Sequence, residues 1–283
     1  MIRIAMRQLP KLLLSKTFLC VHQRCYSIVP QSNTEKQPTV KDFVKSNVGL
    51  SNFLQRVYVT AGAGLATSLV IPATTIYCAS QFVQAAAPAL LFGGFGTAII
   101  GCFGMAYGKW TVNEARTEST NSLPRQLSFC ALVGGMSMAL TPFAQAIHEI
   151  SPTIWPTALA LTIGTSGAAT LWAHNRPVDS LLSWQGPLYG GLLALVGTGF
   201  SGLIAQTFFP ASGVGQLLHS VDVYGGILLF TAMTAYETQK AVAMYLDGEP
   251  DHLGCAVHVY LDFINLLIRI AEALAKAKGD KDD

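Results

Sequence analysis

Residues 256–274 read AVHVYLDFINLLIRIAEAL, a stretch apolar enough to lie inside a membrane that still carries Asp262 near its middle and Arg269 two turns later. Nineteen residues are about enough for a helix to cross the hydrocarbon core of a bilayer. A charge at mid-bilayer costs about 2.5–3.5 kcal/mol on insertion scales, and such charges usually have a function. The stretch therefore predicts a membrane helix with a functional carboxylate.

The chain as a whole has the composition of a polytopic membrane protein. Of its 283 residues, 51% are hydrophobic and only 12% are charged. Four segments lack Asp, Glu, Lys and Arg, and each can hold a span of about 20 residues or, for the first, two. These segments are 57–108, 126–148, 150–175 and 180–221. We predict an all-α fold, a seven-helix transmembrane bundle with spans at about 57–79, 86–107, 127–147, 154–173, 186–206, 218–239 and 256–274.

The first 26 residues differ from the rest. They contain five basic residues, and the first acidic residue of the chain is Glu35. An Arg-rich, acid-free start predicts a mitochondrial presequence. Arg24-Cys25-Tyr26-Ser27 fits a matrix-peptidase pattern, so cleavage is expected after Tyr26. A secretory signal is the alternative, but Lys16 interrupts its apolar run. Without these five basic residues the formal net charge falls from +2 to −3, which gives no indication of a nucleic-acid partner.

The expected organisation is a presequence at 1–26, a polar, solvated matrix-side arm at 27–52, a membrane domain at 53–276 and a charged tail at 277–283. Lys and Arg lie before the first span, between the second and third, between the fourth and fifth, and after the sixth, but not in the other three loops. This alternation supports the span count and places the arm on the positive side, here the matrix. Whether the last segment crosses fully is left open.

Small-residue motifs have two interpretations each. Gly104/Gly108 and Gly186/Gly190 have GxxxG spacing, which favours close helix packing over a phosphate cradle. Gly164-Thr165-Ser166-Gly167 matches the GxSG of rhomboid-type intramembrane proteases, but the chain's histidines are poorly placed to activate the serine. We favour packing and predict no enzymatic activity. The scattered cysteines predict neither a disulfide framework nor a zinc site.

The last span predicts a polar stripe about 80° wide at helical spacing. Its members are His258, Asp262, Asn265, Arg269 and Glu272. We expect the stripe to face the bundle interior or a water-filled cavity. The alternative is a helix lying on the membrane surface with the stripe facing outward.

Glu237, near the matrix end of span six, is the expected partner of Asp262. A solvated turn within 241–255 folds span seven back against span six, so the two carboxylates can meet at one depth. Two carboxylates in contact share a proton, and when ionised they suit calcium. Oxygen ligands to complete such a site are available on Tyr236, Thr238, Gln239 and Asn265.

Asp222 lies at the far end of span six, about 22 Å from Glu237 along the helix. It is either a cavity-mouth group or an ordinary interfacial charge.

Two segments resemble the transmembrane Bax inhibitor motif family, whose members have seven helices. They are VYGGILLFTAMTAYETQKAV (223–242), with an acid before Thr-Gln, and VYLDFINLLIRI (259–270), with its Leu-Asp-Phe-Ile-Asn run. The similarity spans about residues 50–275 and, with the presequence, is greatest to the mitochondrial branch. The family's first acid is usually Asp, where this chain has Glu237.

The resemblance implies a pH-sensitive calcium leak or calcium/proton exchange pathway in which Glu237 and Asp262 act as sensor and gate. It also implies the inner membrane, cristae maintenance, cytochrome c retention, protection from apoptosis and protein partners in those processes. Lys109 is the candidate for the basic latch that bacterial relatives carry near span two. The alternative is a structural protein that scaffolds cristae and moves no ions.

Overall fold

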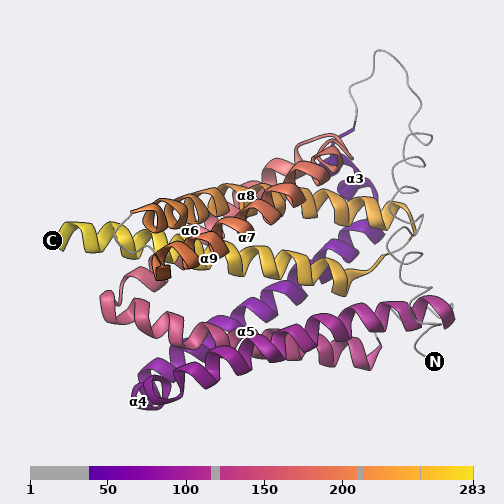
Figure 1. Cartoon of the computed structure of the whole chain (residues 1–283). Coiled ribbons are helices and arrows are strands. Elements are labelled where there is room, and N and C mark those ends of the chain that lie inside the picture. The colour runs from indigo at the N-terminus through magenta and orange to yellow at the C-terminus, as the bar shows by residue number, and fades with distance from the viewer. Residues whose placement is uncertain (1–37, 116–121, 209–212, 249, 283) are drawn as a thin grey trace, which may run out of the picture. The chain divides into compact units, whose positions relative to one another are not determined.

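A computed structural model describes residues 38–115, 122–208, 213–248 and 250–282. The described chain is helical, as predicted, and runs through the elements shown in Figure 1. They are α3 (Val40–Ser46), α4 (Val48–Ala115), α5 (Leu123–Ile150), α6 (Ile154–His174), the 3-10 turn η2 (Leu182–Trp184), α7 (Gln185–Phe208), α8 (Val214–Leu246) and α9 (His252–Asp282). Each of the seven predicted spans lies within one of these helices. The proposed presequence and its cleavage point at Tyr26 lie outside the described residues.

The long helix α4 contains both of the first two predicted spans and folds back on itself. Gly64 in its first half and Gly101 in its second half both lie against the turn of α5 at Leu132 and Val133. They are 37 residues apart, about 56 Å along a straight helix, so α4 must reverse direction. Pro72 and Pro88 lie inside α4, and each weakens its helical hydrogen bonding. Figure 1 shows the reversal near the α4 label.

Glycines allow the second half of α4 to pack backbone to backbone against α5. A Cβ added at Gly94 would lie 2.6 Å from the Ala139 nitrogen, and one added at Gly135 would lie 2.5 Å from the Ala98 nitrogen. No side chain fits at such distances, so glycine is required for this approach. The predicted role of GxxxG spacing is not observed at Gly186 and Gly190, where an added Cβ would meet nothing within 4 Å.

Helix α9 lies among four others and contacts α4, α5, α6 and α8. Its most buried positions are apolar or aromatic, among them Tyr260, Ile264 and Leu267. The predicted single inward-facing polar stripe is not confirmed, because Asp262 is buried whereas the His258 side chain is 48% exposed. With neighbours on several sides, α9 has no single inward face for a stripe to occupy.

The described part of the expected arm lies against the basic loop between α6 and α7. Val40 N–H donates to the Arg176 carbonyl in the loop between α6 and α7 (3.1 Å), and Val40 and Leu50 are fully buried. This part of the chain is therefore packed rather than solvated as expected. The Gln239 side chain of α8 binds the same loop, accepting from Leu181 N–H at 2.8 Å and donating to the Pro177 carbonyl at 3.1 Å. We call the end of the molecule that contains Val40, Gln239 and the α6–α7 loop the loop end.

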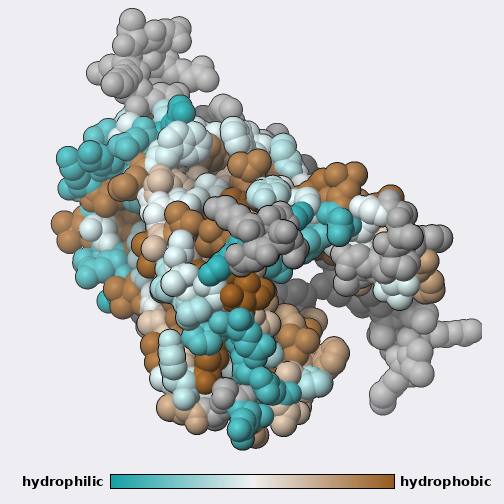
Figure 2. Space-filling model, turned by 90° about the vertical axis from the view of Figure 1, so that its left-hand side faces the viewer, coloured by the Kyte–Doolittle hydropathy of each residue, from teal (hydrophilic) through white to brown (hydrophobic). Residues whose placement is uncertain are grey.

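Five helical segments among the described residues are long and apolar enough to cross a membrane. They are Val48–Cys78, Gln81–Tyr107, Leu123–Ile150, Val214–Leu246 and His252–Gly279. The chain is therefore a multi-pass membrane protein, and its last helix is long enough to cross. Figure 2 views the molecule from the left of Figure 1, the end at which α9 terminates, and shows hydrophilic side chains gathered among hydrophobic ones there.

Candidate functional site

Glu237 is buried on α8, with only 3% of its side chain exposed, and its partners come from two helices. Lys240, one turn later, donates from Nζ to Glu237 Oε1 at 2.9 Å. His258 of α9 places Nδ1 3.8 Å from the same oxygen. Sequence reasoning counted Lys240 only as a loop charge, although its i,i+3 spacing from Glu237 is typical of a helical ion pair.

Asp262 is equally buried on α9, at 4% exposed, but its charge is not satisfied in the same way. Its Oδ2 is buried and accepts no hydrogen bond. Glu237 and Lys240 are the charged groups that act on it electrostatically. The structure thus brings the two predicted acids into one electrostatic cluster, although no hydrogen bond joins them among the described residues.

The cluster holds two buried acids and one lysine whose side chain is partly exposed. With Glu237 and Asp262 ionised and Lys240 charged, it carries one net negative charge when His258 is neutral. A buried net charge is costly, and binding one proton or another cation removes it. A proton and a cation would therefore compete for the same charge.

Of the side chains expected to complete a calcium site, Gln239 has its oxygen engaged elsewhere, whereas the bonds of Thr238 and Asn265 are donor bonds that leave their oxygens able to accept. Gln239 binds the α6–α7 loop through both its oxygen and its nitrogen. Thr238 donates to the Thr234 carbonyl at 2.9 Å, and Asn265 donates to the Leu261 carbonyl at 2.8 Å. Within the described residues, no group of three or more His, Cys, Asp or Glu side chains is placed to hold a metal ion.

A buried charge pair that the sequence did not predict links α5 to the start of α9. Arg125, at the start of α5, donates from Nη2 to both carboxylate oxygens of Asp251, at 2.9 and 2.8 Å. The side chains are 2% and 7% exposed, so Asp251 does not lie in a solvated turn as expected. Asp251 also accepts from Gly254 N–H at 3.0 Å and so caps α9. In the sequence, Arg125 and Asp251 both lie in loops that the charge alternation places on the positive side of the membrane. No other feature of the sequence indicates that they meet.

Asp222 and Arg269 form a second link between α8 and α9, toward the other end. Arg269 Nη1 lies 2.7 Å from Asp222 Oδ2 and also donates to the Asp222 carbonyl. The guanidinium packs over Phe230 at 5.5 Å and against Gly226, where no side chain would leave it room. Arg269 was predicted as part of the polar stripe and Asp222 as a cavity-mouth or interfacial charge, and here each neutralises the other.

Two further sequence-based candidates have different outcomes. The Lys109 side chain lies outside the described residues. Ser166, the serine of the Gly-Thr-Ser-Gly motif, has a buried hydroxyl with no hydrogen-bond partner. Serine chemistry needs a base within hydrogen-bond reach, and Ser166 has none in the part of the chain that the structure describes.

Comparison with known proteins gives a consistent result. Residues 50–279 match the family model described as inhibitor of apoptosis-promoting Bax1. The chain belongs to this family. It is 31% identical to growth hormone-inducible transmembrane protein of Rattus norvegicus over 127 residues, which cover 42% of this chain and 36% of the rat protein.

Two plant relatives match over most of their length. Bax inhibitor 1 of Oryza sativa subsp. japonica is 25% identical over 245 residues, covering 87% of this chain and 88% of that protein. Bax inhibitor 1 of Arabidopsis thaliana is 25% identical over 256 residues, covering 89% and 92%. No solved structure matches.

Proposed function

We propose that this Bax inhibitor family member is a seven-span protein of the mitochondrial inner membrane that exchanges calcium, or a similar cation, for protons. The observation that carries the proposal is Asp262, a buried carboxylate with an unpartnered oxygen beside Glu237. Such a group is costly at membrane depth and is therefore expected to have a function.

Seven crossings follow if the two halves of α4 each cross and α6 and α7 cross as well. Helices α6 and α7 have 21 and 24 residues and contain no Asp, Glu, Lys or Arg. At 1.5 Å per residue they are about 31 and 36 Å long, enough for a hydrocarbon core of about 30 Å.

The two acids have similar depths. Glu237 lies nine residues before the end of α8 at Leu246, and Asp262 lies ten residues after the start of α9 at His252. These separations correspond to about 14 and 15 Å along the helices. A cation entering from the loop end would meet both carboxylates together, and a proton would compete for the same charge.

The driving forces constrain the direction of exchange. A membrane potential of 100 mV, matrix negative, drives a divalent cation inward by about 4.6 kcal/mol. Calcium exit therefore requires coupled proton entry or depolarisation. A site that holds a proton or a cation, but not both, provides such coupling.

The mitochondrial location rests on the Arg-rich, acid-free first 26 residues and on the similarity to growth hormone-inducible transmembrane protein. Inhibition of apoptosis rests on the family description. Cristae maintenance and cytochrome c retention rest on the family resemblance alone.

The test is calcium flux into dye-loaded proteoliposomes under an imposed pH gradient. We expect the parent protein to move calcium with a rate that depends on pH, and Glu237→Gln and Asp262→Asn to abolish that flux. Asp42→Asn, an exposed site in α3, is the matched control and should behave as the parent. If both cluster variants transport normally, the site assignment is wrong.

The second candidate function is a scaffold without transport. The Gln239 bonds to the α6–α7 loop favour it, because they fix α8 against that loop. In that case vesicles with parent protein leak no faster than protein-free vesicles. Pull-downs would then recover the same partner proteins from parent, Glu237→Gln and Asp262→Asn.

A further inference from the structure

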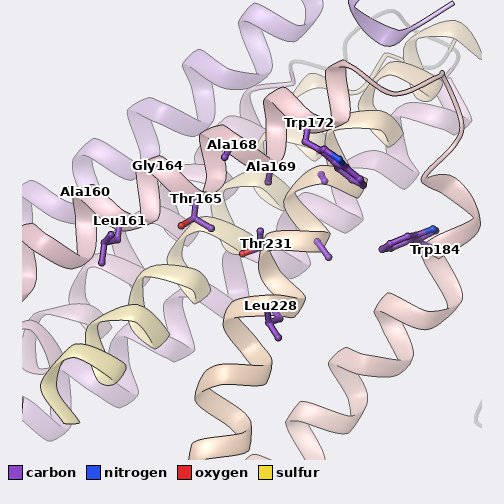
Figure 3. A pocket seen from close by; sticks show the side chains of 12 residues that line it. Ala160, Leu161, Gly164, Thr165, Ala168, Ala169, Trp172, Trp184, Leu228 and Thr231 are labelled. Atoms are coloured by element: carbon purple, nitrogen blue, oxygen red, sulfur yellow. The ribbon is translucent and has the colours of Figure 1, made fainter. Parts of the chain in front are cut away.

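An apolar groove of about 660 Å³ lies between α6 and α8, with η2 at one end. Figure 3 shows Leu161 at one end, Leu228 and Thr231 along α8, and Trp172 and Trp184 at the other end. The volume is within the range of small-molecule sites. The Thr231 hydroxyl donates to the Ile227 carbonyl of its own helix at 2.7 Å, so it needs no partner in the groove.

The groove is as long as one membrane leaflet is deep. Leu161 and Trp172 are eleven residues apart on α6, about 16 Å, and half of a hydrocarbon core is about 15 Å. Between Leu161 and Trp172 the α6 wall consists of the small residues Gly164, Thr165, Ala168 and Ala169, so a chain one methylene wide can lie against the helix. The shape suits an acyl chain that runs along α6.

The tryptophan end of the groove is polar and cationic. Trp172 and Trp184 are 41% and 48% exposed, and tryptophan is enriched where membrane meets water. Arg176 stacks on Trp172, with its guanidinium carbon 4.7 Å from the ring centre. Among the described residues, no carboxylate forms an ion pair with Arg176. An apolar channel that ends at an unpaired guanidinium matches a ligand with an apolar tail and an anionic head.

We propose that the groove binds one anionic glycerophospholipid of the leaflet at the loop end. One acyl chain lies along Gly164 and Thr231, and the headgroup phosphate contacts Arg176 between the two tryptophans. Basic pockets between membrane helices commonly hold anionic headgroups. The groove is lined by other residues of α8 than Glu237, and the proposal does not depend on cation transport.

The test measures quenching of tryptophan fluorescence by lipids brominated on the acyl chain. Trp110 and Trp155 are replaced by Phe, so that only Trp172 and Trp184 report. The protein is placed in phosphatidylcholine nanodiscs with rising fractions of brominated phosphatidylglycerol or brominated phosphatidylcholine. We expect saturable quenching, with phosphatidylglycerol about fivefold more effective, since one cation near the surface contributes about 1 kcal/mol.

Two variants separate headgroup from chain binding. Arg176→Ala should abolish the lipid preference and keep the fold, because Arg176 is exposed. Gly164→Leu should fill the groove and abolish saturable quenching by both lipids. Their controls are Arg56→Ala and Gly197→Leu, at an exposed basic position and an exposed glycine with space around it.

Two outcomes overturn the proposal. Equal quenching by both lipids, unchanged in Gly164→Leu, means that ordinary surrounding lipid is being detected. A parent protein that is dimeric by light scattering and becomes monomeric in Gly164→Leu, with no lipid preference, means that a second copy of this chain occupies the groove.

Discussion

Asp251 and Asp262 lie eleven residues apart at the start and in the first half of α9, and both are buried, but only one is neutralised. Asp251 accepts two hydrogen bonds from Arg125 and one from Gly254. Asp262 keeps a buried oxygen without any hydrogen bond and shares a single lysine with Glu237. A paired carboxylate fixes a helix in place, whereas an unpaired one can take up and release a counter-ion. The difference separates the structural acid from the candidate functional one.

The largest expected effect comes from removing the cation at the structural site. Arg125→Leu leaves Asp251 charged and buried, and breaking a buried ion pair costs about 3–5 kcal/mol. We expect a large drop in the thermal midpoint in detergent. Adding Asp251→Asn should recover part of the loss, since Asn still caps α9. An unchanged midpoint in Arg125→Leu would remove the distinction between the two aspartates.

The next effect concerns the cation of the functional cluster. Lys240→Met leaves Glu237 and Asp262 together without the charge of Lys240. We expect about 1–3 kcal/mol of destabilisation at pH 8. The loss should be smaller than in Arg125→Leu, because the Lys240 side chain is 25% exposed. The loss should diminish as the pH falls, because a bound proton can replace the missing positive charge. Lys240→Arg keeps the charge and is the control. A pH-independent loss would mean that packing, not charge, is responsible.

Neutralising Asp262 should lower the stability only slightly, or raise it. Asp262→Asn removes a charge that no hydrogen bond satisfies at Oδ2, so stability should stay within about 1 kcal/mol of the parent or rise. Thermal unfolding of Asp262→Asn beside Asp251→Asn makes the comparison direct. A loss at Asp262 as large as that from Arg125→Leu would show that Asp262 is a structural residue.

The smallest effect is expected in the α6–α7 loop. Burial, together with nearby Asp247, raises the pKa of Asp179 above its usual 3.8. An acid with a raised folded-state pKa destabilises the fold once pH rises above the unfolded value, so Asp179→Asn should add about 0.5 kcal/mol at neutral pH. Below about pH 3.8 the gain should vanish, because both states are then protonated. Asn also tolerates the φ of +67° at this position. Stability measured at pH 7 and pH 3.5 checks both parts.

The membrane class and the helix positions followed from the sequence because both depend on local composition. A charge-free run of 20 residues has few alternatives to a membrane helix, and each predicted span was found inside a helix. The common side of the arm and basic loops also followed from charge counts, and the Val40–Arg176 and Arg125–Asp251 contacts agree with it. The polar stripe failed because helical periodicity gives a face but not the number of neighbours around it.

By itself, the sequence determined that this chain is an all-helical, multi-pass membrane protein with acids at Glu237 and Asp262 on its last two long helices. Only the tertiary structure decided which of its charges are satisfied. Arg125 meets Asp251 across 126 residues, and Arg269 meets Asp222 across 47. A local sequence pattern cannot predict contacts between residues so far apart in the sequence, because these contacts depend on how the helices pack. That packing satisfies two of the aspartates and leaves Asp262 with an open oxygen.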